Sequence, residues 1–246
     1  MTNEQALAPI ISLLADKIRN EDFVISPSLW KTVELVAPII ELDPTQPNLK
    51  FGNIRQTPEK YVRKELEWYL SESLSSEVIA KSAKIWKQIS SRDDKVNSNY
   101  GWCIFSEENF NQFANAAREL LTNPDSRRAC MLYNRPSMWN DYNENGMSDF
   151  MCTFATQHMI RDHELLTVVN MRSNDIIFGF FNDFWWQSFV HNMLHENLNK
   201  KYPGIGPGKI LWIANSLHAY ERHFKMILEM DELLSQTTNQ TENNGI

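Results

Sequence analysis

Apolar residues recur every three or four positions in five stretches of the chain, the spacing of helices with one buried face. Pro9 falls inside the first stretch, where a helix tolerates proline only in its opening turn. Ser106 precedes the third stretch as a possible N-cap. The pattern predicts helices over Leu7 to Arg19, about Thr57 to Ser73, Glu107 to Leu121, Phe184 to Leu198, and Tyr220 to Leu234.

Other stretches are short and rich in Val, Ile and Leu, which is typical of strands. Pro44 to Pro58 holds three prolines and is expected to be mostly loop. The polar residues Ser235 to Ile246 show no apolar pattern and are expected to form a loose tail. The predicted strands are Thr32 to Leu42, Ala129 to Tyr133, Phe150 to Ile160, Leu165 to Asn170, and Lys209 to Ile213.

Helices interleaved with strands indicate an α/β or α+β fold, built on one mixed or mainly antiparallel sheet flanked by helices. With 246 residues, of which 42% are hydrophobic, the chain can bury a substantial core. We therefore expect one domain spanning residues 1–246.

The formal net charge is −7, which disfavours a general nucleic-acid or membrane surface, so an anionic ligand would need a local basic pocket. The three cysteines lack metal-ligand spacing, and no signal peptide or apolar run of about 18 residues is present. These features predict a cytoplasmic protein with no metal site.

Cys152 is a candidate nucleophile, because arginines follow it in sequence and a nearby guanidinium would lower the pKa of its thiol. It is expected to lie inside a strand. A buried structural role is the alternative for any free cysteine, and it is the reading we keep for Cys103 and Cys130.

Several motifs occur in an order that resembles the thymidylate synthase superfamily, and within it the phage deoxycytidylate hydroxymethylases. The resemblance runs from about Tyr61 to Phe224. The motifs are Glu65-Leu-Glu-Trp68, Ile85-Trp86, Asn99-Tyr-Gly101, Asn123-Pro-Asp-Ser-Arg-Arg128, Phe150-Met-Cys152, Met171-Arg-Ser-Asn-Asp175, Gly179 through Asp183, and Leu217-His-Ala-Tyr220.

The resemblance implies a thymidylate synthase-like fold that forms a homodimer by sheet packing. It makes Cys152 the thiolate that adds to carbon 6 of the pyrimidine. It makes Glu65 the carboxylate that organises water and proton transfer. Glu67 is a competing acid two residues on, which cannot share a helix face with Glu65.

The resemblance also implies a phosphate site. Arg172 and Ser173 would bind the phosphate with Arg127 and Arg128, which the partner protomer would donate. Guanidinium groups bind phosphate oxygens in pairs, which would supply the basic pocket. Without the motif, the Arg127-Arg128 pair reads as a solvated surface turn.

By the same resemblance, His218 and Tyr220 would read the sugar hydroxyls. Asp175 would hold the folate's pterin, and Trp86 and Tyr100 would line the folate and pyrimidine site, although core packing is the ordinary explanation for either ring.

Two departures from the superfamily pattern stand out. Its N-terminal phosphate-binding arginine has no match near Ser26-Pro27-Ser28, where Lys31 is a weak substitute, and Thr153 replaces its usual histidine.

Asp183 stands where thymidylate synthases carry the asparagine that reads uracil, four residues after Gly179. A carboxylate can accept from the exocyclic amine of cytosine and share a proton with ring nitrogen 3, whereas uracil presents the reverse pattern. The shared proton would also assist attack by Cys152. Two alternatives remain. Asn182 could be the reader, which would favour uracil, or either residue could simply cap a helix that begins at Phe184.

The function implied is transfer of a one-carbon unit from 5,10-methylenetetrahydrofolate to carbon 5 of dCMP, followed by water addition, giving 5-hydroxymethyl-dCMP and tetrahydrofolate. The polar tail lacks an apolar closing segment, which is consistent with a site that admits water. Implied partners are dCMP, folate, a second copy of the chain, and a nucleotide-synthesis enzyme complex in a phage host's cytoplasm. Alternatives are a dUMP-using thymidylate synthase or hydroxymethylase, and an idle nucleotide- or RNA-binding dimer.

Overall fold

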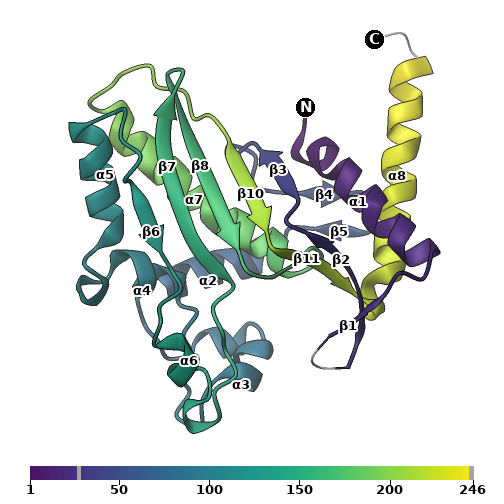
Figure 1. Cartoon of the computed structure of the whole chain (residues 1–246), viewed down its shortest axis with the longest axis horizontal. Coiled ribbons are helices and arrows are strands. Elements are labelled where there is room, and N and C mark those ends of the chain that lie inside the picture. Colours follow the sequence, from purple (N-terminus) through teal and green to yellow (C-terminus); the bar gives the residue numbers. More distant parts are fainter. Residues whose placement is uncertain (27–28, 244–246) are drawn as a thin grey trace.

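The computed structural model describes residues 1–26 and 29–243, which contain two large β-sheets and one two-stranded sheet (Figure 1). One of the two large sheets has the strand order β1-β2-β11-β9, and the other has the order β3-β10-β8-β7-β6. The strands are β1 (Val24–Ile25), β2 (Lys31–Val36), β3 (Ile39–Leu42), β6 (Cys130–Leu132), β7 (Thr153–Arg161), β8 (Glu164–Met171), β9 (Asn174–Asp175), β10 (Ile210–Ala214) and β11 (Ser216–Tyr220).

The predicted strand Thr32 to Leu42 is broken into β2 and β3, which belong to different sheets. The break lies at Ala37, whose φ is 50°, and Pro38, which has no N–H to give to a ladder. Opposite this break, Asn215 separates β10 from β11, and its carbonyl accepts from the Ala37 N–H at 3.2 Å. Strand β11, which the sequence analysis missed, pairs antiparallel with β2 and parallel with β9.

Strands β7 and β8 form a hairpin whose two loop residues, Asp162 and His163, have φ of 50° and 61°. Positive φ at both central residues is the requirement of a tight two-residue hairpin turn. Strand β8 then pairs parallel with β10, so this sheet is mixed as predicted, but the expectation of a single sheet was wrong. Cys152 lies immediately before β7, not inside a strand, because the ladder with β8 begins at Thr153 and is irregular up to Ala155.

Helix α7 (Gly179–Asn199) begins five residues before the predicted start at Phe184. It joins two hydrophobic cores. Phe180, Phe181 and Phe184 belong to the core shared with α1 (Asn3–Arg19), α8 (Phe224–Asn243) and the sheets. Trp186, Val190, Leu194 and Leu198 belong to the core shared with α2 (Glu59–Leu70), α4 (Tyr100–Phe105) and α5 (Gln112–Thr122).

Two more predicted helix starts, those of α1 and α5, were wrong. Thr2 and Gln5 form a capping box that begins α1 at Asn3, which places Pro9 beyond the first turn. Ser106 caps only the short turn Glu107–Asn109, and the left-handed pair that follows, Phe110 and Asn111, delays α5 until Gln112.

The predicted loose tail was also wrong as far as Asn243. Tyr220 ends β11, a short 3-10 turn covers Glu221–His223, and α8 then runs to Asn243. Ile227 and Met230 of α8 belong to the core shared with α1, and Arg19 binds Asp231 at 2.7 Å. This packing supports the helix, whose last turns simply extend beyond the core (Figure 1).

The remaining elements are short. Residues 44–58 are mostly loop, as predicted, with one small hairpin. The hairpin consists of β4 (Lys50–Phe51) and β5 (Arg55–Gln56). The other short elements are the helices α3 (Ile85–Ile89) and α6 (Met138–Asp141) and the 3-10 turns Ile79–Lys81 and Glu144–Gly146.

Candidate active site

A cleft of about 950 Å³ brings seven predicted site residues together, at the ends of β8, β9 and β11 and the start of α7. Those seven are Cys152, Arg172, Ser173, Asp175, Asp183, His218 and Tyr220, and the other lining residues are Ser148, Asn174, Gly179 and Ser216.

Arg172 is fixed beside Cys152. Its guanidinium donates to the carbonyl oxygens of Met151 and Phe150, both at 2.8 Å, and its Nη2 lies 3.7 Å from Cys152 Sγ. The Arg172 backbone N–H also donates to the Cys152 carbonyl at 2.8 Å. The thiol and the guanidinium are therefore held together by backbone contacts.

The expected lowering of the Cys152 pKa was wrong for the single chain. Arg172 does lower it, but burial outweighs the guanidinium and raises the pKa to about 11. Asp183 and Asp149 raise it further. A thiolate at Cys152 would need more positive charge than this chain alone supplies.

Asp183 lies in the second turn of α7, so it does not cap the helix. The residue at the N-cap position is Phe178, and the cap has no side-chain hydrogen bond. Asp183 lines the cleft, whereas Asn182 does not, and the side-chain carbonyl of Asn182 is buried without a hydrogen-bond partner among the described residues. The helix-cap explanation is excluded, and Asp183 is the residue that faces the cleft.

Burial raises the pKa of Asp183 to about 7, with a further contribution from the charge of Asp175. Hydrogen bonds from Asn174 and Tyr100 oppose this shift. The Asn174 amide donates to Asp183 Oδ2 at 2.8 Å. Near neutral pH, Asp183 is therefore divided between its acid and its carboxylate.

Glu65 lies behind the cleft on α2. Its carboxylate accepts a hydrogen bond from Tyr61 at 2.6 Å, and the Tyr61 hydroxyl in turn accepts from Trp86 Nε1 at 2.8 Å. Burial raises the pKa of Glu65 to about 8, and the charge of Asp183 contributes. Sequence reasoning gave Tyr61 no role at the site, although its position four residues before Glu65 on a helix places it within reach.

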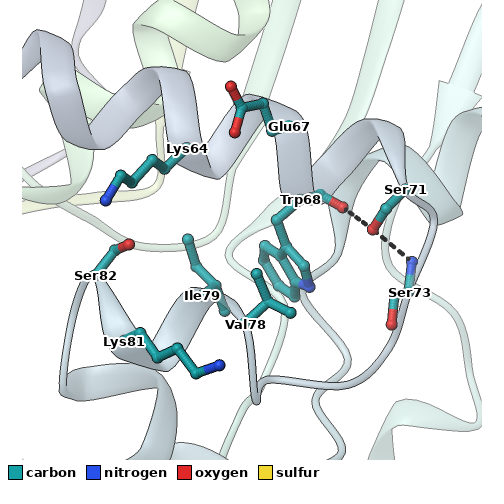
Figure 2. Close-up of a pocket in the computed structure, with 9 residues that line it drawn as sticks. All are labelled: Lys64, Glu67, Trp68, Ser71, Ser73, Val78, Ile79, Lys81 and Ser82. Atoms are coloured by element: carbon teal, nitrogen blue, oxygen red, sulfur yellow. Dashed lines mark hydrogen bonds between the residues drawn. The ribbon is translucent and has the colours of Figure 1, made fainter.

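Glu67 lies on the other side of α2. It is exposed and lines a separate hollow with Lys64 and Trp68, between α2 and residues 78–82 (Figure 2). Glu65 and Glu67 therefore face different parts of the molecule, as their spacing requires.

His218 and Tyr220 extend from β11 into the cleft, with ring centroids 5.1 Å apart. Asp175 stands beside His218 on the parallel strand β9, and its Oδ1 accepts from the Ile177 N–H at 2.9 Å. Short strands thus hold three polar side chains on one wall.

The two predicted folate-site aromatics do not line the cleft. Tyr100 is 4% exposed and stacks on Tyr69 at a centroid distance of 5.2 Å. Trp86 is 8% exposed and lies 4.8 Å from the Trp68 ring. Tyr100 reaches Asp183 from behind the cleft, whereas Trp86 donates to Tyr61, which does not line the cleft.

Arg127 and Arg128 lie in the exposed segment between α5 and β6, outside the cleft of the same chain. Arg128 pairs with Glu119 at 2.9 Å, with most of its side chain in solvent. Lys31 is also outside the cleft, over the ring of Phe23 at 5.2 Å. Pro27 and Ser28 lie outside the described residues.

No group of three or more His, Cys, Asp or Glu side chains in residues 1–26 and 29–243 could hold a metal ion. None of the helices in the described part of the chain combines the length and apolar character that crossing a membrane requires.

Comparison with known proteins confirms the resemblance drawn from the motifs. The family model of thymidylate synthase matches residues 28–242. Deoxycytidylate 5-hydroxymethyltransferase of Enterobacteria phage T6 is 44% identical over 213 residues, 85% of this chain and 84% of that protein. The phage T4 enzyme of the same name is 44% identical over 216 residues, with the same shares. Thymidylate synthase of Fusobacterium nucleatum is 26% identical over 180 residues, 71% of this chain and 62% of that protein.

Proposed function

The chain belongs to the thymidylate synthase family, and on that premise we propose that it is a deoxycytidylate hydroxymethyltransferase. It transfers a one-carbon unit from 5,10-methylenetetrahydrofolate to carbon 5 of dCMP and adds water, giving 5-hydroxymethyl-dCMP and tetrahydrofolate. The observation that carries the substrate choice is the cleft-facing carboxyl of Asp183, whose pKa is raised to about 7.

Asp183 suits cytosine because it can be acid and acceptor at once. Its protonated oxygen donates to ring nitrogen 3, and its other oxygen accepts from the exocyclic amine. Uracil would set a carbonyl oxygen against a carboxylate oxygen and leave its own N–H opposite a donor. Sites built on buried polar groups reject such mispaired analogues by roughly 10⁴-fold.

Arg172 and Ser173 bind the 5′-phosphate with Arg127 and Arg128 from the partner protomer. This division fits their positions, because Arg172 lines the cleft while the arginine pair stands exposed elsewhere on the same chain. His218 and Tyr220 bind the sugar hydroxyls. The added positive charge of the partner's arginines also favours the Cys152 thiolate, whose pKa is high in the single chain.

Cys152 attacks carbon 6 of the pyrimidine, and Asp183 neutralises the charge that develops on the ring by giving its shared proton to nitrogen 3. Carbon 5 then becomes nucleophilic. Arg172, at 3.7 Å from the sulfur, stabilises the thiolate before attack. After the carbon–carbon bond forms, carbon 5 loses its proton and the bond between the transferred carbon and the folate nitrogen breaks, which releases tetrahydrofolate and leaves an exocyclic methylene on carbon 5. Once water has added to that methylene, Cys152 leaves carbon 6 in the last step and restores the aromatic ring.

Methylenetetrahydrofolate supplies the one-carbon unit at the oxidation level of formaldehyde. The cleft, at about 950 Å³, lies at the upper end of the 300–1,000 Å³ typical of small-molecule sites. Asp175 Oδ1 accepts from the Ile177 N–H, and Oδ2 is the oxygen that would accept from ring N–H groups. Asp175 would hold the pterin, while Trp86 and Tyr100 support the wall behind it.

Glu65 controls the water step. Its raised pKa, about 8, leaves much of it protonated at neutral pH, and Tyr61 and Trp86 hold its orientation. In its ionised form, Glu65 accepts a proton from the water that adds to the exocyclic methylene on carbon 5, which becomes CH₂OH. No hydride is transferred, so the folate product is tetrahydrofolate.

The homodimer fits an open face of the five-stranded sheet. Register aligns Leu132, Ala155, Asn170, Ile213 and Ile39 in one row across its five strands. Ile39 is 66% exposed and Leu132 is 59% exposed, and α7 lies behind the sheet in Figure 1. A second copy covering this row would bury it.

We extend the proposal to residues 1–246 as one catalytic domain, because α7 contributes to both hydrophobic cores. The proposal also places the enzyme in the host cytoplasm, as a member of a nucleotide-synthesis enzyme complex. The phage relatives support a phage origin.

Mass measurement of the products tests this function. Purified protein is incubated with methylenetetrahydrofolate and either dCMP or dUMP. A gain of one CH₂O unit on dCMP, with release of tetrahydrofolate, supports it, and Cys152→Ala is the matched inactive control. Turnover of dUMP alone, a gain of CH₂ with dihydrofolate, or no product from either nucleotide would refute it.

A further inference from the structure

Asn174 stands beside Asp183, the carboxyl proposed to read the base. We propose that Asn174 is a positioning residue for substrate choice, which directs the shared proton of Asp183 to Oδ1 and keeps Oδ2 as the acceptor for the exocyclic amine. This inference rests on the proposed function and deepens it.

Among the hydrogen bonds of residues 1–26 and 29–243, the Asn174 side chain makes one, and it is to Asp183. Its Nδ2 donates to Asp183 Oδ2 at 2.8 Å, while its own carbonyl oxygen is buried without a partner among the described residues. A buried, unpaired carbonyl is costly. An asparagine kept at this cost, 3% exposed and at the wall of the cleft, is there for its contact with Asp183.

The backbone holds Asn174 in place. It belongs to β9, where it pairs with Leu217 of β11. The absence of a side chain at Gly179 provides space for this contact. A side-chain carbon there would lie 3.3 Å from Asn174 Nδ2 and 3.5 Å from Asp183 Oδ2. The amide and the carboxyl are thus packed together by two elements, β9 and α7.

Tyr100 and Asn174 both donate to Asp183, and the amide N–H of Asn174 favours Oδ2 as the oxygen that stays unprotonated. An ionised oxygen accepts a hydrogen bond better than a hydroxyl oxygen does, so the donor from Asn174 favours negative charge on Oδ2 and the proton on Oδ1. Oδ1 then donates to nitrogen 3 of cytosine, and Oδ2 accepts from the exocyclic amine. Reading uracil would require the proton on Oδ2, where it would weaken the bond from Asn174.

The test compares Asn174→Leu, which keeps the size but loses the donor, with the unmodified protein. We measure kcat/KM for dCMP and dUMP over pH. The ratio of dCMP to dUMP should fall about tenfold, the factor that 1.4 kcal/mol produces. The alkaline limb of the dCMP profile should move to higher pH, because the Asn174 bond lowers the pKa of Asp183.

Asn192→Leu is the matched control. The Asn192 amide donates to the Pro44 carbonyl at 2.9 Å and lies outside the cleft, so its loss should leave the ratio and the limb unchanged. Asn174→Asp is the second variant if Asn174→Leu does not fold, since it replaces the donor with an acceptor and should lower the ratio as well.

If kcat/KM in Asn174→Leu fell equally for dCMP and dUMP, and the alkaline limb of the dCMP profile did not move, the role of Asn174 would be purely structural. That result would overturn this inference alone. An unmodified protein that does not convert dCMP would overturn the proposed function and this inference together.

Discussion

The hydroxyl of Tyr61 donates a 2.6 Å hydrogen bond to the carboxylate of Glu65, one helical turn away on α2. Tyr61 in turn accepts from Trp86 Nε1 at 2.8 Å. The acid assigned to the water step is thus oriented by a two-membered chain of aromatic side chains.

Tyr61→Phe should lower kcat for dCMP by about 10- to 100-fold, because a hydrogen bond to a charged group is worth about 1.5–3 kcal/mol. Steady-state kinetics measures the effect. Tyr202→Phe is the control, since Tyr202 donates to the Leu121 carbonyl at 2.8 Å and lies outside the cleft. An unchanged kcat in Tyr61→Phe would contradict the role of Tyr61 in orienting Glu65.

Arg172→Met should slow alkylation of Cys152 by iodoacetamide at least about tenfold without nucleotide present, because an adjacent opposite charge shifts a pKa by about 1 unit or more. Mass spectrometry of the labelled peptides gives the rate at each cysteine. Cys103 is buried and its pKa is raised to about 12, so new labelling there would report unfolding. An equal rate at Cys152 in both proteins would contradict the role given to Arg172.

Mixed dimers test the donated arginines. Cys152→Ala and the Arg127→Ala/Arg128→Ala variant should each be nearly inactive alone. After unfolding and refolding together in equal amounts, half of the dimers are mixed, and each carries one intact site, which predicts about a quarter of full activity. Refolding either variant with itself is the control. No recovery in the mixture would mean that the arginines serve their own chain's site.

A buried histidine pair predicts acid sensitivity. Thr167 Oγ1 lies 2.9 Å from His158 Nδ1 and 2.7 Å from His191 Nδ1, and burial lowers the pKa values of His158 and His191 to about 3 and about 4. Both rings are neutral when folded. Their stability contribution is complete above pH 6.5, the unperturbed value, and is lost as pH falls toward the folded values.

His158→Asn should therefore reduce the slope of unfolding free energy against pH, between pH 6.5 and 4, by about 1.4 kcal/mol per pH unit. Urea unfolding at several pH values measures it. His163→Asn, at an exposed position, should leave the slope unchanged. A His158→Asn slope equal to that of the unmodified protein would show that the ring is charged when folded.

Hydrophobic periodicity predicted most elements but few of their ends. The start of α7 shows why. Phe184 begins the strongest apolar pattern, yet the helix starts at Gly179, because Phe180 and Phe181 pack into the core shared with α1. Contacts with segments distant in sequence determine where α7 begins, and the local sequence pattern does not reveal those contacts. The same error had made Asp183 a candidate helix cap.

The motifs predicted which residues line the cleft, but they did not predict the pKa values of those residues. Seven proposed residues line it together, and Asp183 faces it. The high pKa of Cys152 could not be predicted from the arginines that follow it, because burial depends on the whole fold. Asn174 was passed over within the Arg-Ser-Asn-Asp motif, since its contact with Asp183 exists only after β9 and α7 meet.

The most direct test of the central claim, that Asp183 selects cytosine, is the ratio of kcat/KM for dCMP to that for dUMP in the unmodified protein and in Asp183→Asn. An amide supplies the donor and the acceptor that uracil requires, and it cannot share a proton with cytosine nitrogen 3. We predict a ratio well above one in the unmodified protein, and a fall of at least about a hundredfold in Asp183→Asn, as polar mispairing allows. An unchanged ratio would contradict the account.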